Sequence, residues 1–554
     1  MTLVEDKKQS LILGALTSSA GIFVTKLMGL FYMVPFTALA GESNLAFYSY
    51  GYGVYENLLN ISLAGLPYAI ATMIAKYSLK EDYKSIEYIR KLSQGIMLGF
   101  GFLCVAIVFL GLDPIARYIT PADMSLEDLQ KTKTVLMLIS LAFISVPLLS
   151  GVRGYFQGLR DLKLYSVSQV IEQFSRITFL LTVGYIAVAI LKADGIYAIY
   201  GAVLSAFVSS VLALVHIYYT RKHVIKEMED KAAAQLLESQ SKKAIARELL
   251  SFSIPFMISS VLGNSLSIVN SFFFSKAMDA AKYTAEETKL LTSMLNLTTS
   301  KLTSIPHFLV IGYSSAIIPY VTTSYEKNDL NLMKKYILDA LDSVTYLGLP
   351  LCFFLFAIGV EIYYVMYGAK SSYVLGGEVL RWQSLSGLLG TVSPIVTSLA
   401  MATRLRRQNL SYMVIGFLVK FVTFFPLIKY TGYSGAVTSS VLCSLTIMGL
   451  NLLAIKKSYD VDYSPYWDHL RKMAIGLLCM FLSFKLLWLV GIRVTDQPRL
   501  IALVELAIYG VAGVVAYLVS TSFLHVPEDI FHLGDTNIFS YALSTLKRIF
   551  RRGK

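Results

Sequence analysis

The sequence carries few charged residues. Only 15% of its 554 residues are Asp, Glu, Lys or Arg, whereas soluble domains carry about 25%. Hydrophobic residues make up 55% of the chain, and the mean hydropathy is +0.60. This composition excludes a soluble globular protein. It predicts an all-α integral membrane protein, because long apolar stretches cross a bilayer as helices.

Cysteine is also scarce. The four cysteines, Cys104, Cys352, Cys443 and Cys479, all lie inside apolar runs. They form no CxxC pair and have no spacing typical of a metal site. We therefore expect small core residues and not a disulfide framework.

Motifs of soluble enzymes are missing too. The sequence has no Walker A or other Gly-rich phosphate loop. No segment between apolar runs is long enough for a soluble catalytic domain. The Asp-Val-Asp at 460–462 resembles a nucleotide-sugar metal motif, but three residues are a weak match. We predict a transporter and not an enzyme, with no catalytic residue, metal or cofactor.

Apolar spans of roughly 20 residues recur along the chain, and we count about fourteen transmembrane helices. An even number puts both termini on the same side of the membrane. Lysines and arginines gather in the loops and tails on the N-terminal side, which the positive-inside rule assigns to the cytoplasm. The net charge of +13 is therefore an orientation signal and not a nucleic-acid surface. The basic C-terminal tail is expected to contact anionic membrane lipids.

A weak internal repeat divides the chain. Residues 69–82 resemble 316–329, and the basic turn at 153–166 corresponds to 398–411. The pattern predicts two six-helix lobes related as parallel repeats, plus a C-terminal helix pair. The predicted parts are an N-lobe (1–219, helices 1–6), an amphipathic cytoplasmic linker (220–248), a C-lobe (249–458, helices 7–12), helices 13 and 14 (459–530) and a basic cytoplasmic tail (531–554).

Some predicted spans contain charges deep in their apolar sequence. Lys26 lies midway through the first span, Glu56 lies in the second, and Lys301 lies in the eighth. Glu56 and Lys301 occupy equivalent positions of the repeat. Such a charge costs about 2.5–3.5 kcal/mol at a helix centre and should face a hydrated cavity or a partner. Two cations on the first and eighth spans suit an anionic head group.

Helical spacing adds polar neighbours to these charges. Tyr48, Tyr52, Glu56 and Asn60 recur every fourth residue and form one stripe. Thr298, Lys301 and Ser304 share a face of the eighth span. The candidate substrate-binding residues are therefore Lys26, Glu56, Asn60, Lys301 and Ser304.

Other charges in the spans have simpler interpretations. Glu172 and Arg176 are spaced for an ion pair within one helix, with Lys420 as their approximate repeat counterpart. These three are candidates for a structural or coupling role. Arg381 and Lys485 are expected to extend toward a membrane interface.

Several motifs resemble one family of membrane transporters. The pieces are "TKLMG" in the first span, "AGLPYAIATMIAKY" in the second, "RGYFQGLRDLKLYSVSQVIEQFSR" after the fourth and "SKLTSIPHFLVIGYSSAIIP" in the eighth. They resemble the MurJ branch of the multidrug and oligosaccharidyl-lipid exporter superfamily, which includes the MATE transporters. The sequences of these motifs are most similar to the Gram-positive YtgP and SpoVB type of this branch.

The resemblance implies a function and roles for individual residues. It implies a flippase of the bacterial cell membrane that turns lipid II, the undecaprenyl-pyrophosphate-linked peptidoglycan precursor, to the outer leaflet. In the family, the eighth helix carries a cavity arginine a few residues before a proline, and Lys301, five residues before Pro306, occupies that place here. The family's first helix carries an arginine in an R-x-x-G pattern, and Lys26 occupies the position of that arginine. The last two spans would form a groove for the lipid tail. Cell-wall synthesis machinery is an implied partner.

The energy source and the substrate stay open at this point. Membrane potential, Na⁺ or H⁺ could drive turnover by alternating access, with Glu56 as the candidate coupling residue. A flippase for another polyprenyl-linked oligosaccharide, such as a capsule or teichoic precursor, is the main alternative. A polytopic cell-wall glycosyltransferase is a further one. It needs catalytic acids in an outer loop, where only 113–131 has several.

Overall fold

The computed structural model describes residues 25, 28–63, 65–236, 239–368 and 372–532. Within these residues the chain is almost entirely helical and has no β-strand. Among the described residues ten helices are long and apolar enough to cross a membrane, and a shorter apolar helix covers Met28–Ala40. The predicted class, an all-α multi-pass membrane protein, is confirmed. The count of fourteen spans stays a prediction.

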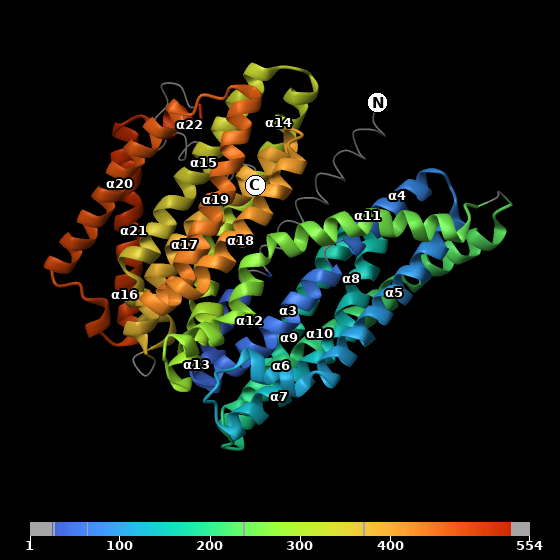
Figure 1. The fold of residues 1–554 in the computed structure, drawn as a ribbon, viewed down its shortest axis with the longest axis horizontal. Helices are drawn as coiled ribbons and strands as arrows, with labels where there is room; N and C mark the ends of the chain where they lie inside the picture. Colours follow the sequence, from blue (N-terminus) through green and yellow to red (C-terminus); the bar gives the residue numbers. More distant parts are fainter. Residues whose placement is uncertain (1–24, 26–27, 64, 237–238, 369–371, 533–554) are drawn as a thin grey trace, which may run out of the picture. The chain divides into compact units, whose positions relative to one another are not determined.

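The chain divides into two compact units, Met1–Leu297 and Thr298–Lys554, whose helices Figure 1 colours along the sequence. The first unit contains α2 (Met33–Ala40), α3 (Leu45–Leu63), α4 (Leu66–Leu79), α5 (Tyr83–Leu110), α6 (Leu112–Ile119), α7 (Leu126–Ser140), α8 (Ala142–Gly158), α9 (Leu162–Tyr185), the π-helical turn η1 (Ile186–Ile190), α10 (Ile196–Ala234), α11 (Lys242–Gly263), α12 (Ser265–Ala280) and α13 (Ala285–Ser293).

The second unit begins inside a π-helical turn, η2 (Met294–Thr298). It continues with α14 (Thr299–Glu326), α15 (Leu330–Ala357), α16 (Gly359–Tyr367), α17 (Tyr373–Ala402), α18 (Arg406–Thr431), α19 (Tyr433–Tyr459), α20 (Ser464–Leu489), the 3₁₀ turn η3 (Val494–Asp496), α21 (Arg499–Phe523) and α22 (Val526–Ile530).

The compact units do not divide where the repeat predicts the lobes to meet. The predicted C-lobe begins at residue 249, but α11, α12 and α13 pack against α3 to α6 and belong to the first unit. The region predicted as a linker, 220–248, contains the end of α10, which stops at Ala234, and the beginning of α11, which starts at Lys242. Its side chains bind the first unit, since Gln235 bonds to Asp82 at 3.0 Å and Glu248 pairs with Lys76. A sequence repeat indicates that two segments have a common ancestor. The division into compact units instead follows from which helices share a core, so the two boundaries need not coincide.

Two glycines of the RGYFQG motif bring α8 close to α4. An ideal Cβ on Gly154 would lie 2.7 Å from the Pro67 carbonyl oxygen, and one on Gly158 would lie 2.6 Å from Ile74 Cβ. Any larger residue must therefore push the two helices apart. The motif that carries the family resemblance has a packing role here.

Gly154→Ala is expected to destabilise the protein by about 1–3 kcal/mol, because its methyl group meets the α4 backbone. Gly99→Ala is the matched control, since a Cβ on Gly99 of α5 meets nothing within 4 Å. The control should be neutral or stabilise by roughly 0.4–1 kcal/mol. Thermal unfolding of both variants in detergent measures the difference. Equal melting temperatures would contradict the close packing of α8 on α4.

Candidate functional site

The predicted polar stripe of α3 is present in the first unit. Tyr48 and Tyr52 stack with ring centroids 5.1 Å apart and planes 12° apart, so both point to one face of α3. Glu56, one turn further, is exposed, and Asn60 is half-buried. An exposed carboxylate midway along an apolar helix is consistent with contact to water and not to hydrocarbon.

Arg176 of α9 faces this stripe. Its guanidinium carbon lies 5.9 Å from the centre of the Tyr52 ring, a distance typical of a cation–π contact. Its predicted helix neighbour Glu172 instead pairs with Arg153 of α8 at 2.7 Å, and Arg153 also bonds to Ser168 at 2.8 Å. The expected ion pair within α9 is therefore replaced by one between α8 and α9. The Arg176 cation lies instead against Tyr52 of α3.

Lys26, the candidate cation of the first span, lies outside the described residues. Its motif partner Gly29 is described, and an ideal Cβ there would lie 3.6 Å from the Gln173 side-chain nitrogen. Gln173 lies one turn before Arg176 on α9. The glycine of the K-x-x-G motif thus packs beside the helix that carries Arg176.

Polar contacts fix the beginning of α14 in the second unit. Thr298 bonds through its hydroxyl to the Tyr363 hydroxyl at 3.1 Å, and its carbonyl accepts from Tyr367 at 3.2 Å. Thr299 bonds to Gln383 of α17. Lys301 follows and is half-buried, and Ser304 donates to the Lys301 carbonyl at 2.6 Å. The candidate cation therefore projects from a helical turn that α16 and α17 hold in place.

The sequence did not identify Tyr363, Tyr367 or Gln383 as members of this site. Tyr363 and Tyr367 are four residues apart and share a face of α16. That four-residue spacing could have indicated that the two tyrosines act together, but it could not identify Thr298 as their hydrogen-bond partner. Only the packing of α16 against the beginning of α14 does so.

Lys420 is fully buried in α18. Its ammonium donates to the Ser440 hydroxyl of α19 at 2.6 Å and lies 5.4 Å from the Phe424 ring centre. The two helices pack closely along their length. Lys420 thus contributes a polar contact between α18 and α19.

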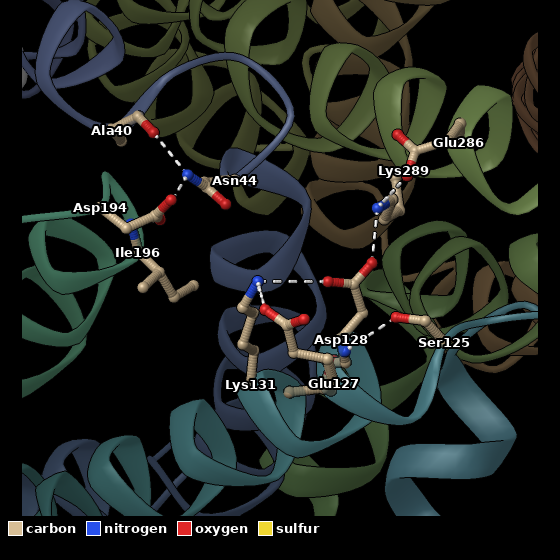
Figure 2. A network of polar contacts seen from close by, with 11 residues as sticks. Ala40, Asn44, Ser125, Glu127, Asp128, Lys131, Asp194, Ile196, Glu286 and Lys289 are labelled. Atoms are coloured by element: carbon tan, nitrogen blue, oxygen red, sulfur yellow. Dashed lines mark hydrogen bonds and ion pairs between the residues drawn. The ribbon is translucent and has the colours of Figure 1, made fainter.

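A network of ion pairs joins α13 to α7 in the first unit (Figure 2). Lys289 of α13 is buried and bonds to Asp128 at 2.7 Å and to Glu286 at 2.6 Å. Asp128 also lies 3.5 Å from Lys131, which pairs with Glu127 at 2.8 Å. Burial lowers the pKa of Lys289, but its bonds to the two carboxylates outweigh burial and raise it above its ordinary value. Lys289 is thus a charged link between the two helices.

The same part of the first unit has a second connection. Asn44 donates to the Ala40 carbonyl at 2.9 Å and contacts Asp194 at 3.4 Å, and Asp194 accepts from the Ile196 backbone amide at 2.8 Å (Figure 2). Within the described residues no cluster of three or more His, Cys, Asp or Glu side chains could hold a metal ion. The polar groups here tie helices together.

A family model for polysaccharide biosynthesis proteins matches residues 11–325, which is more than half of the chain. The chain belongs to the polysaccharide biosynthesis protein family. Among its relatives is the lipid II flippase MurJ of Bacillus subtilis strain 168, 25% identical over 518 residues that cover 92% of this chain and 94% of the relative. Stage V sporulation protein B of the same organism is 24% identical over 86% of this chain and 89% of its own.

Solved structures show the fold of this family member. A lipid II flippase MurJ in an inward closed conformation matches with a TM-score of 0.67 and 13% identity, covering 92% of this chain and 99% of that one. An inward-facing MATE family multidrug transporter matches with a TM-score of 0.62 and 14% identity, covering 78% and 99%. The predicted resemblance and the MurJ- and MATE-like fold are confirmed.

Proposed function

We propose that this protein is a flippase that moves lipid II from the inner to the outer leaflet of the bacterial cell membrane by alternating access. The observation that carries the proposal is its similarity to the Bacillus subtilis lipid II flippase over nearly the full length of both chains. The polar residues of the two units fit this role. The first unit supplies Glu56, Asn60 and Arg176, and the second supplies Lys301 and Ser304.

The chemistry of the substrate explains why such residues are needed. A pyrophosphate-linked sugar head cannot cross hydrocarbon unaided, so cationic and hydrated surfaces must shield it. An inside-negative membrane potential favours outward movement of an anion by about 2.3 kcal/mol per charge per 100 mV. Glu56 remains our candidate for binding a returning Na⁺ or H⁺.

The joint between the two units supports alternating access. The boundary between the units falls within η2, a π-helical turn, and such turns often mark functional sites within helices. Pro306 and Pro319 follow within α14, and each removes a backbone hydrogen bond. We propose that α14 bends at these points as the carrier changes conformation.

A cavity in the second unit suits part of a lipid tail. It has a volume of about 500 Å³ and lies among α15, α17, α19 and α20. Leucines from all four helices line it, including Leu349, Leu388, Leu452 and Leu470. Lys456 and Asp462 line the cavity as well, and its leucine-lined part adjoins α20. We assign binding of the isoprenoid chain to α20 and α21, the predicted helix pair.

The test uses cells whose essential lipid II flippase can be depleted. This protein is expressed during depletion, and lipid II exposed on the outer leaflet is labelled and quantified. Restored labelling and growth supports the proposal. A transport-inactive variant of the cells' own flippase, expressed at the same level, sets the background.

A flippase for another polyprenyl-linked oligosaccharide is the second candidate. The family description and the similarity to the stage V sporulation protein favour keeping it. If the protein reaches the membrane but lipid II labelling stays at background, this candidate replaces the first. The gene would then be deleted, and a polyprenyl-linked saccharide that accumulates in the deletion strain would be identified as the substrate.

A further inference from the structure

Besides the leucine-lined cavity, the second unit has another cavity, and two cations line it in apolar surroundings. It has a volume of about 580 Å³ and lies among α15, α17 and α20. Arg381 of α17 and Lys485 of α20 line it, together with apolar side chains that include Phe353, Leu477 and Phe481. None of the described residues that line it is acidic.

No carboxylate of the described residues pairs with Arg381. Its Nε atom is buried and lacks a hydrogen-bond partner. Among the described residues no carboxylate lies within 4.0 Å of its guanidinium, and Glu378, one turn earlier on α17, makes no ion pair with it. A guanidinium among apolar groups is costly unless it is paired. Arg381 therefore lines the cavity as a cation without a counter-ion among the described residues.

The helices make room for this arginine. An ideal Cβ on Gly359 of α16 would lie 3.0 Å from Arg381 Cγ. A larger residue at 359 would displace the arginine stem from its place against α16. Gly359 thus fixes where the guanidinium enters the cavity.

Lys485 provides the second charge. It is exposed, and its ammonium lies 5.5 Å from the centre of the Phe481 ring. The described residues place no carboxylate within ion-pair distance of it either. Phe356 and Leu478, which also line the cavity, are 42% and 57% exposed. The cavity is therefore open at an apolar part of the protein surface.

We propose that this cavity binds an anionic glycerophospholipid, with the phosphate between Arg381 and Lys485 and an acyl chain along Phe353, Phe356 and Leu478. Two cations beside an apolar wall match a phosphate attached to a hydrocarbon chain. Soluble phosphate would leave the apolar wall unfilled. The opening at an apolar part of the surface favours a lipid of the leaflet itself.

The position of the cavity along the helices indicates which membrane leaflet the bound lipid belongs to. Arg381 lies near the beginning of α17, Lys485 lies near the end of α20, and Phe353 and Phe356 lie near the end of α15. In the proposed orientation these helix ends face the outer leaflet. The lipid would hold α20 against α15 and α17, so its binding should also raise thermal stability.

The test compares lipid binding by three proteins. Wild type, the double variant Arg381→Gln/Lys485→Gln and the control Lys429→Gln are purified in detergent. Lys429 is an exposed cation near the end of α18 and does not line the cavity. Native mass spectrometry then counts bound dioleoyl-phosphatidylglycerol or dioleoyl-phosphatidylcholine at equal concentrations.

Wild type and the control should retain phosphatidylglycerol about tenfold better than phosphatidylcholine, and the double variant should lose this preference. Phosphatidylglycerol should raise the melting temperature of wild type and not of the double variant. Leu478→Trp keeps both charges and narrows the cavity from its exposed side. It should also weaken retention, which keeps the proposal testable if the double variant misfolds.

Two results would overturn the proposal. One is equal retention of phosphatidylglycerol by wild type and either cavity variant. The other is retention of added undecaprenyl diphosphate through Arg381 and Lys485 with no preference between the two phospholipids, which would assign the cavity to an isoprenoid lipid. Because the readout is binding, it is independent of whether lipid II is the transported substrate.

Discussion

Replacing Lys301 with alanine is expected to lower at least about tenfold the outer-leaflet lipid II labelling that wild-type protein restores in flippase-depleted cells. The cation projects from a turn of α14 held by Tyr363, Tyr367 and Gln383. A hydrogen bond to a charged group contributes about 1.5–3 kcal/mol, which is roughly a tenfold to hundredfold effect. Labelling per unit of membrane-inserted protein is the measurement.

Two further variants separate charge from structure in this experiment. Lys301→Arg keeps the charge and adds a fork suited to pyrophosphate, so it should retain transport. Lys327→Ala removes an exposed cation just beyond the end of the same helix and should behave as wild type. If Lys301→Ala restores full labelling at normal membrane levels, Lys301 does not contact the head group.

Lys289→Met is expected to destabilise the first unit by about 3 kcal/mol. The substitution leaves Asp128 of α7 without its buried partner on α13. Breaking a buried ion pair from one side typically costs about 3–5 kcal/mol. Lys131, 3.5 Å from Asp128, offsets part of that cost. Unfolding in a detergent and denaturant titration measures the change.

A double-variant cycle tests whether the ion pair is the cause. Adding Asp128→Leu to Lys289→Met removes the orphaned carboxylate and should recover most of the lost stability. Lys231→Met is the control, because its pair with Glu227 is exposed on both sides and should contribute less than about 1 kcal/mol. An equal loss in Lys289→Met and Lys231→Met would contradict the role assigned to burial.

The sequence predicted the fold class well, because hydropathy and helical spacing are local properties. Among the described residues ten long apolar helices match predicted spans, and the stripe from Tyr48 to Asn60 begins with the stacked Tyr48 and Tyr52. The family resemblance also followed from short motifs. The division into lobes at the linker differs from the compact units, because α11 to α13 share a core with α3 to α6.

The candidate site was predicted less completely. Spacing could suggest that Glu172 and Arg176 pair, because they are one turn apart on a helix. It could not place Arg153 of α8 beside Glu172, or Arg176 beside Tyr52 of α3. Likewise, Arg381 and Lys485 were expected only to extend toward an interface. They are about 100 positions apart, and packing brings them to one cavity.

The sequence by itself determined that this protein is a helical membrane protein of the MurJ-like type with charges placed deep in its spans. The reason is that the bilayer imposes a local rule on every span: its residues must be apolar and its backbone groups must be bonded within the helix. Only the tertiary structure decided which charges meet, where the units divide and which cations lack a protein partner. Those outcomes depend on contacts between helices far apart in the chain, and no local pattern encodes them.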